Sequence, residues 1–144
     1  MEPGYLLQCA GCGAERRVPP SETSLRHRCG RCGAPLIGSQ ALPVEVTDAT
    51  WEAEVAASEA PAVVVAWSPH CGVCGQYEVS VRRMAGSLFG AARVLTLDVE
   101  ENRKTAERYG IKGVPMVLLF REGRLLAALP GPQGERGLRE RLGV

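Results

Sequence analysis

The sequence has no long hydrophobic run, and this absence argues against a membrane-spanning protein. Its longest apolar stretch lies between Ala60 and Trp67, whereas a helix needs about 20 apolar residues to cross a bilayer. The N-terminal stretch MEPGYLLQCAGC also lacks the basic and apolar regions of a secretory signal. We therefore expect a cytoplasmic protein without a membrane partner. In a reducing cytosol, closely spaced cysteines are typical of metal sites or catalysis rather than of structural disulfides.

A dominant charge and a large aromatic content are missing as well. The 17 basic and 16 acidic residues give a net charge of +1, which provides no overall attraction to nucleic acid or anionic membranes. Aromatic residues make up 5% of the chain. A basic group does occur near the N-terminus: Arg16, Arg17, Arg26, His27, Arg28 and Arg31. Because only Tyr5 could stack on bases there, we interpret this group as solvated surface and expect no nucleic-acid partner.

The sequence does contain six cysteines, all in C-x-x-C pairs. Two of the pairs lie in residues 1–41, a segment with too few apolar residues to offset the entropy of ordering it. From Val44 onward, the patterns of strands and helices alternate. The sequence therefore predicts two domains, a small module at 1–41 and a larger domain at 42–144, with residues 38–40 as the linker.

The four N-terminal cysteines have the spacing of a zinc site. Cys9, Cys12, Cys29 and Cys32 follow the pattern C-x2-C-x16-C-x2-C, and the repeats CAGCGA and CGRCGA resemble two matching knuckles. Four thiolates would make a closed structural Zn²⁺ site, whose binding energy would replace the missing core. The alternatives are two disulfides or four free thiols. His27 could substitute as a ligand, but we expect it to be a plain surface residue.

The larger domain shows a clear order of elements. We predict strands at 43–48, 62–67, 93–98, 116–120 and 124–129. We predict helices after Asp48, from Cys74 to Leu88, at 102–109 and at 135–142. This order gives an α/β fold, with helices on both faces of a mixed sheet.

The third cysteine pair falls where a buried strand ends and a helix starts. At a helix N-terminus, unpaired amides and the helix dipole stabilise a thiolate, so Cys71 is predicted to be a nucleophile. Cys74 lies one turn further along, where its sulfur can reach that of Cys71 and resolve a mixed disulfide. The alternative is a third metal half-site. It is disfavoured because the domain holds no second cysteine pair and His70 is the only extra ligand nearby.

From Val44 to Val144 the chain resembles the thioredoxin family. The resemblance rests on the apolar strand ending in Trp67, the Cys71-Gly72-Val73-Cys74 motif, the segment YGIKGVP ending at Pro115, and Gly131. With the cysteine module in front, the chain is similar to the zinc-containing second type of bacterial thioredoxin.

The resemblance implies a five-stranded thioredoxin-like sheet and a catalytic pair, Cys71 and Cys74. It also implies a cis peptide before Pro115 that faces the cysteines, with the Val114 backbone pairing with the substrate chain. The expected partners are client proteins with disulfides and a reductase that supplies electrons, and the expected state is a monomer. The residues expected to contact substrate are Trp67, His70, Gly72, Val73, Val114 and Pro115.

The sequence departs from the thioredoxin pattern at four positions. His70 stands where the family has tryptophan, and Val73 stands where it has proline. The buried aspartate and the nearby lysine of the family align with Val65 and Thr96. Glu78 and Asp98 are possible substitutes for the acid, although neither is favoured.

Two functions from different classes are therefore considered. The first is a cytosolic protein disulfide reductase that cycles between a Cys71/Cys74 dithiol and disulfide. The alternative is a zinc-dependent redox-sensing or client-binding (holdase-like) module with weak disulfide exchange. The missing acid leaves the net direction of exchange open, because exchange can proceed with water in place of that base, only more slowly in the resolving step.

Overall fold

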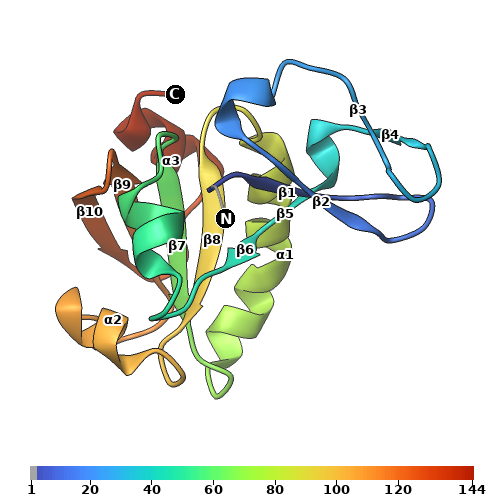
Figure 1. The fold of residues 1–144 in the computed structure, drawn as a ribbon. Helices are drawn as coiled ribbons and strands as arrows, with labels where there is room; N and C mark the ends of the chain where they lie inside the picture. Colours follow the sequence, from blue (N-terminus) through green and yellow to red (C-terminus); the bar gives the residue numbers. More distant parts are fainter. Residues whose placement is uncertain (1–2) are drawn as a thin grey trace.

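The computed structural model describes residues 3–144, and its larger part is a mixed five-stranded sheet (Figure 1). The strands lie in the order β10-β9-β7-β8-β6. Strands β6, β7 and β8 run parallel, whereas β9 is antiparallel to both β7 and β10. The predicted thioredoxin-like α/β fold is confirmed. The strand bounds are β6 Val44–Glu45, β7 Ala62–Trp67, β8 Arg93–Asp98, β9 Met116–Arg121 and β10 Arg124–Pro130.

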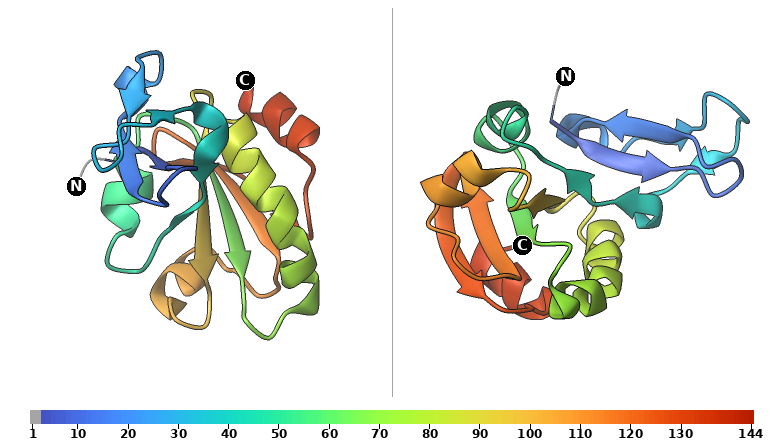
Figure 2. Two further views of the ribbon diagram at one scale, coloured as in Figure 1. Left: turned by 90° about the vertical axis from the view of Figure 1, so that its right-hand side faces the viewer. Right: turned by 90° about the horizontal axis from the view of Figure 1, so that it is seen from below.

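Helices cover both faces of this sheet because the strand side chains alternate between two apolar clusters. Val63 and Val65 of β7 face helices α1 (Gly72–Ser87) and α3 (Glu135–Leu142). Val64 and Ala66 face the opposite cluster, which includes residues of a π-helical turn, η3 (Glu52–Ala56), and Tyr109, next to α2 (Arg103–Arg108). Figure 2 shows this layering from two further sides. Among residues 3–144, no helix is long and apolar enough to cross a membrane.

Several predicted boundaries differ from the structure: the strand predicted at 43–48 is limited to β6 at Val44–Glu45, and the helix predicted at 102–109 is limited to α2 at Arg103–Arg108. Two further differences have a visible cause. Asp48 does not cap the following helical segment, which is a π-helical turn; its Oδ1 instead accepts hydrogen bonds from the Thr105 amide at 2.9 Å and hydroxyl at 2.7 Å. Helix α1 begins at Gly72 rather than at Cys74. In both places a side chain forms a bond that the periodic pattern of apolar residues does not reveal.

The N-terminal module, residues 3–41, consists of short strands and turns. Its two small sheets have the strand orders β2-β1-β5 and β3-β4. Strand β5 crosses the predicted domain boundary, so the boundary between residues 41 and 42 stays a prediction. The elements are β1 Tyr5–Gln8, β2 Glu15–Val18, η1 Pro20–Glu22, β3 His27–Arg28, β4 Pro35–Leu36, η2 Gly38–Gln40 and β5 Ala41–Leu42.

The apolar core of the N-terminal module is small and includes two of its cysteines. Its buried members are Leu7, Cys9, Val18, Cys29, Leu36 and Ala41. Phe89, which follows α1, packs against this cluster, and its ring lies 4.8 Å from that of Tyr5 in an edge-on arrangement. The module therefore borrows apolar surface from the larger domain, which agrees with the shortage of apolar residues in its sequence.

The segment predicted as a linker is a tightly packed contact. A side chain at Gly38 would bring its Cβ within 2.4 Å of the Phe89 ring. At Gly86 of α1, a Cβ would lie 2.7 Å from the carbonyl oxygen of Ser39. Gly38 and Gly86 are thus required by close approach of the two parts, so residues 38–40, predicted as the linker, form a closely packed segment.

A buried ion cluster fastens the N-terminal module to the sheet. Arg93 is 1% exposed; its Nη2 donates to Glu54 Oε1 at 2.9 Å and its Nε donates to the Gly4 carbonyl at 2.8 Å. Arg17, from β2, donates to Glu54 Oε2 at 2.9 Å. Glu54 therefore pairs with one arginine from each part of the chain.

Candidate functional site

The fold places Cys71 at the N-terminus of α1, as predicted. Strand β7 ends at Trp67, and after a short turn Cys71 becomes the N-cap residue of the helix. Its Sγ accepts a hydrogen bond from the Cys74 amide at 3.1 Å. An amide aimed at the sulfur stabilises a thiolate, so this position favours the nucleophilic form of the cysteine.

Cys71 and Cys74 form a disulfide in the structure, with their Cα atoms 5.3 Å apart. Cys71 is half-exposed, whereas Cys74 is 8% exposed. This difference in access fits the predicted division of roles, in which an incoming disulfide meets Cys71 and Cys74 resolves the intermediate.

The Val114–Pro115 peptide is cis and lies beside the cysteines, as the family resemblance implied. Cys71 Sγ is 3.6 Å from the Val114 carbonyl oxygen. Val114 is half-buried and Pro115 is buried, at the start of β9. The structure thus brings this segment, which is more than forty residues away in sequence, against the nucleophilic sulfur.

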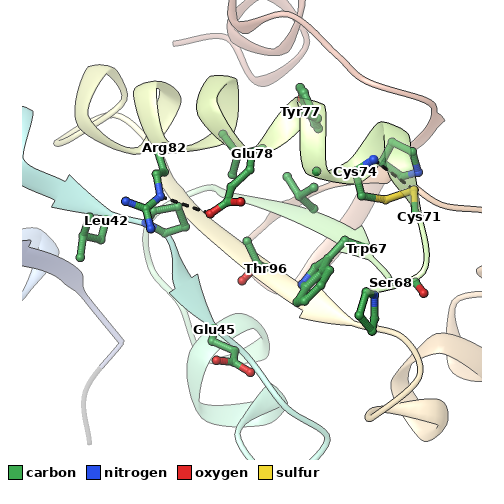
Figure 3. Close-up of a pocket in the computed structure, with 16 residues that line it drawn as sticks. Leu42, Glu45, Trp67, Ser68, Cys71, Cys74, Tyr77, Glu78, Arg82 and Thr96 are labelled. Atoms are coloured by element: carbon green, nitrogen blue, oxygen red, sulfur yellow. Dashed lines mark hydrogen bonds and ion pairs between the residues drawn. A yellow bond between two sulfur atoms is a disulfide. The ribbon is translucent and has the colours of Figure 1, made fainter.

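A groove of about 440 Å³ borders the disulfide. Figure 3 shows helix α1 on one side of it and the strands β7 and β8 on the other. Trp67 and Pro115 line this groove together with both cysteines. The other four residues expected to contact substrate lie outside its lining: Gly72 and Val73 are exposed on the first turn of α1, His70 is exposed on the preceding turn, and Val114 is half-buried next to Pro115.

The groove passes over the place where thioredoxins are expected to bury an acid. Val65 and Thr96 are partners on adjacent strands, and both line the groove. The two positions aligned with the aspartate and the lysine of the family therefore lie side by side beneath the groove. Glu78 reaches into the same groove and pairs with Arg82 at 3.5 Å (Figure 3). Asp98 does not line the groove, and its Oδ1 accepts hydrogen bonds from backbone amides in the turn after β8.

Sequence reasoning missed one part of this site. Glu100, in the turn after β8, hydrogen-bonds to Ser68 and to His70, which precede Cys71. The Glu100 contacts raise the pKa of the His70 imidazole, through the hydrogen bond first and the negative charge second. Ser68 and then His70 in turn lower the pKa of the Glu100 carboxyl. No local sequence pattern links Glu100 to the cysteine motif, because the two approach each other only through the pairing of β7 with β8.

The predicted metal ligands converge in the N-terminal module. The sulfurs of Cys9, Cys12, Cys29 and Cys32 all lie within 4.8 Å of one another, with two of the separations at 3.5 Å. Four thiolates around a tetrahedral Zn²⁺, at the usual bond length of about 2.3 Å, are roughly 3.8 Å apart. The donor set and its spacing therefore fit zinc.

The two halves of this cysteine cluster have the same backbone geometry. Gly13 and Gly33 both have φ of +77°, and each of their amides donates to the carbonyl of the first cysteine in its pair at 2.9 Å. The amides of Cys32 and Arg31 lower the pKa of the Cys29 thiol to about 6, so Cys29 readily supplies one of the four thiolates that a zinc ion would require. These equivalent turns explain the glycine after each pair, since a positive φ favours glycine.

His27 is not part of the cysteine cluster. Its side chain is buried, and its Nε2 lies 2.8 Å from the Glu22 carbonyl oxygen. The expectation of a plain surface histidine is therefore wrong. The His27 ring can be buried because its Nε2 hydrogen-bonds to the backbone carbonyl of Glu22.

The fold and the site together define a thiol–disulfide oxidoreductase: a half-exposed cysteine caps a helix, bonds to a second cysteine one turn later, and faces a cis proline. A family model of thioredoxin matches residues 42–143. The chain belongs to the thioredoxin family.

Individual relatives agree with this assignment. The chain is 32% identical over 132 residues to thioredoxin M4, chloroplastic, of Arabidopsis thaliana, an alignment covering 87% of this chain and 65% of that protein. It is 33% identical over 103 residues to thioredoxin 2 of Chlorobaculum tepidum, covering 69% and 94%. It is 33% identical over 88 residues to thioredoxin of Pseudomonas aeruginosa, covering 61% and 82%. The chain thus spans just under two thirds of the length of the Arabidopsis relative.

Proposed function

We propose that the protein is a cytosolic protein disulfide reductase. The observation that carries this proposal is the position of Cys71: a half-exposed N-cap sulfur, bonded to Cys74, with the Val114 carbonyl 3.6 Å away. An extended client segment that pairs with the Val114 backbone would bring its own disulfide to the Cys71 sulfur. A cytosolic location agrees with the four N-terminal cysteines, which are not disulfide-bonded among residues 3–144.

The reaction follows from the two cysteines. The Cys71 thiolate attacks one sulfur of a client disulfide, which breaks that bond and forms a mixed disulfide, while the second client sulfur leaves as a thiol after gaining a proton. Cys74 then loses its proton and attacks Cys71, which releases the first client sulfur. The client gains two electrons and two protons, and the protein is left with the Cys71–Cys74 disulfide seen here. A dithiol-supplying reductase partner returns it to the reduced form.

We further propose that the N-terminal cysteines hold one structural Zn²⁺. All four ligand positions would be filled by Cys9, Cys12, Cys29 and Cys32, so the ion would offer no open position to a substrate. When bound, it would supply folding energy to a module whose apolar core is small. The proposal includes a monomer as the working state of the protein.

Catalysed reduction of insulin by dithiothreitol tests the proposed activity. We expect the reduced full-length protein to accelerate insulin reduction and the Cys71→Ser variant to lose this acceleration. Ser80→Ala is the matched control, because Ser80 is exposed on the same helix, lies outside the lining of the groove and leaves the Cys71–Cys74 pair intact. Equal acceleration by the wild type and Cys71→Ser would rule out the proposed function.

A further inference from the structure

A hydrogen-bonded cluster outside the cysteine motif joins the turn that carries Cys71 to the turn after β8. Glu100 Oε2 accepts a hydrogen bond from Ser68 Oγ at 2.5 Å and lies 2.9 Å from His70 Nδ1. Glu100 Oε1 lies 3.2 Å from the same ring nitrogen. The amide of His70 donates to Ser68 Oγ at 3.2 Å. One carboxylate therefore holds two of the three residues that connect β7 to Cys71.

The carboxylate itself is held in place by the sheet. Asp98, the last residue of β8, is 9% exposed, and its Oδ1 accepts hydrogen bonds from the Glu100 amide at 3.0 Å and the Glu101 amide at 3.4 Å. The Asn102 side chain donates to the Asp98 carbonyl at 3.0 Å. Because β8 pairs with β7, this turn is a fixed support beside the active-site turn.

The charges around His70 favour its protonated form. Glu100 raises the pKa of the imidazole most, and the negative charge of Asp98 adds to the effect. Arg103, at the start of α2, acts on Glu100 and helps to keep that carboxylate ionised. The His70 and Glu100 side chains are 83% and 42% exposed. Exposed ion pairs contribute little to folding stability, so a stabilising role alone does not account for this arrangement.

We propose that Glu100 is a positioning residue for thiol–disulfide exchange: it fixes Ser68 and the His70 ring, and so keeps an imidazolium next to Cys71. A nearby positive charge favours the Cys71 thiolate, which is the attacking form. This stabilisation of the Cys71 thiolate is present below the pH at which His70 loses its proton and is lost above that pH. Because Glu100 raises that pH, it extends the range over which Cys71 is assisted. This inference depends on the thiol–disulfide chemistry of Cys71 and adds a residue to it.

The experiment measures the pH dependence of Cys71 alkylation in the reduced full-length protein. Iodoacetamide is the probe, modification of the peptide that contains Cys71 is followed by mass spectrometry, and the His70 ring is titrated by NMR on the same samples. The variants are Glu100→Gln, which removes the charge at nearly constant shape, and His70→Asn. Glu101→Gln is the matched control: Glu101 is the exposed neighbour, and only its amide joins the cluster.

We expect two inflections in the wild-type profile, one from Cys71 and one from His70. Glu100→Gln should move the His70 inflection to lower pH, in the NMR titration and in the alkylation profile alike, whereas Glu101→Gln should leave it in place. His70→Asn should abolish this inflection, and adding Glu100→Gln to that variant should change nothing further.

Superimposed alkylation profiles for Glu100→Gln and Glu101→Gln would overturn the proposal. This holds even if Glu100→Gln lowered the thermal midpoint, because a purely structural role would change the stability of the protein and leave the pH of the His70 inflection unchanged. Insulin reduction by the wild type distinguishes a failure of the Glu100 role from a failure of the proposed function. If the wild type reduces insulin and the profiles superimpose, only the role of Glu100 fails. If it does not reduce insulin, the proposed function fails.

Discussion

Removing the charge of Glu54 should destabilise the whole chain, because this residue pairs with two arginines at once. Arg93 is 1% exposed, and the Glu54 side chain is 8% exposed, so their interaction is shielded from water. Arg17 is 30% exposed and brings a second positive charge to the same carboxylate. In Glu54→Gln the shape is nearly conserved, but Arg93 becomes a buried charge without a counter-charge.

The size of the effect follows from the cost of leaving a buried charge unpaired. Breaking one partner of a buried ion pair costs about 3–5 kcal/mol. For a chain of 144 residues, each kcal/mol lowers the thermal midpoint by roughly 4 °C, so the midpoint should fall by ~10–20 °C. Because Arg93 also donates to the Gly4 carbonyl, we expect the N-terminal segment to become more accessible to protease in the same variant.

The assays are thermal unfolding, which gives the midpoint, and denaturant unfolding, which gives the free energy, on the wild type, Glu54→Gln and a matched control, Glu52→Gln. Glu52 lies in the same π-helical turn and pairs with Arg108 at 2.8 Å, but the two side chains are 72% and 54% exposed. Loss of an exposed pair costs about 0–1 kcal/mol. A loss of similar size in both variants would refute the reasoning, since it would show that burial of Arg93 does not decide the cost.

Two further predictions concern the cysteine sites. In Val65→Asp, a carboxylate enters the groove that both cysteines line, so the Cys71 thiolate should form at higher pH than in the neutral control Val65→Asn, and mixed disulfides should be released faster. A titration of thiolate absorbance compares the Cys71 pKa of the two variants. Equal pKa values would mean that another group, such as Glu78, already supplies the charge. The wild type purified without added metal should contain one zinc per chain by metal analysis, and a Cys9→Ser, Cys12→Ser variant that kept full zinc would contradict the assigned ligand set.

The parts of this fold that sequence predicted are those with a local pattern. Strand β7 is a continuous apolar, β-branched run, and its bounds were predicted as residues 62–67. Helix α3 was predicted at its observed bounds, because Leu138 and Leu142 repeat at helical spacing. The N-terminal cysteine pairs were assigned from their spacing, and the Cys71/Cys74 pair from its place between a predicted strand and a predicted helix.

The parts that sequence missed depend on tertiary contacts between distant residues. Arg93 was read only as the first residue of a strand, although its guanidinium bonds to the carbonyls of Gly4 and Glu54. Glu100 belonged to no motif, yet it lies within hydrogen-bonding distance of His70. Residues 38–40 had the composition of a linker, and only the approach of Phe89 shows why glycine is needed there. A buried charge or a close backbone contact is set by its partner, which local periodicity does not specify.

Trapping a mixed disulfide tests the central claim, that Cys71 attacks client disulfides and Cys74 resolves them, most directly. The reduced Cys74→Ser variant is mixed with a disulfide-containing protein, and the adduct is mapped by mass spectrometry. The geometry predicts a stable adduct at Cys71, because the half-exposed N-cap sulfur can attack while the resolving thiol is missing. Normal turnover by Cys74→Ser, or an adduct at Cys9, Cys12, Cys29 or Cys32 in place of Cys71, would contradict it.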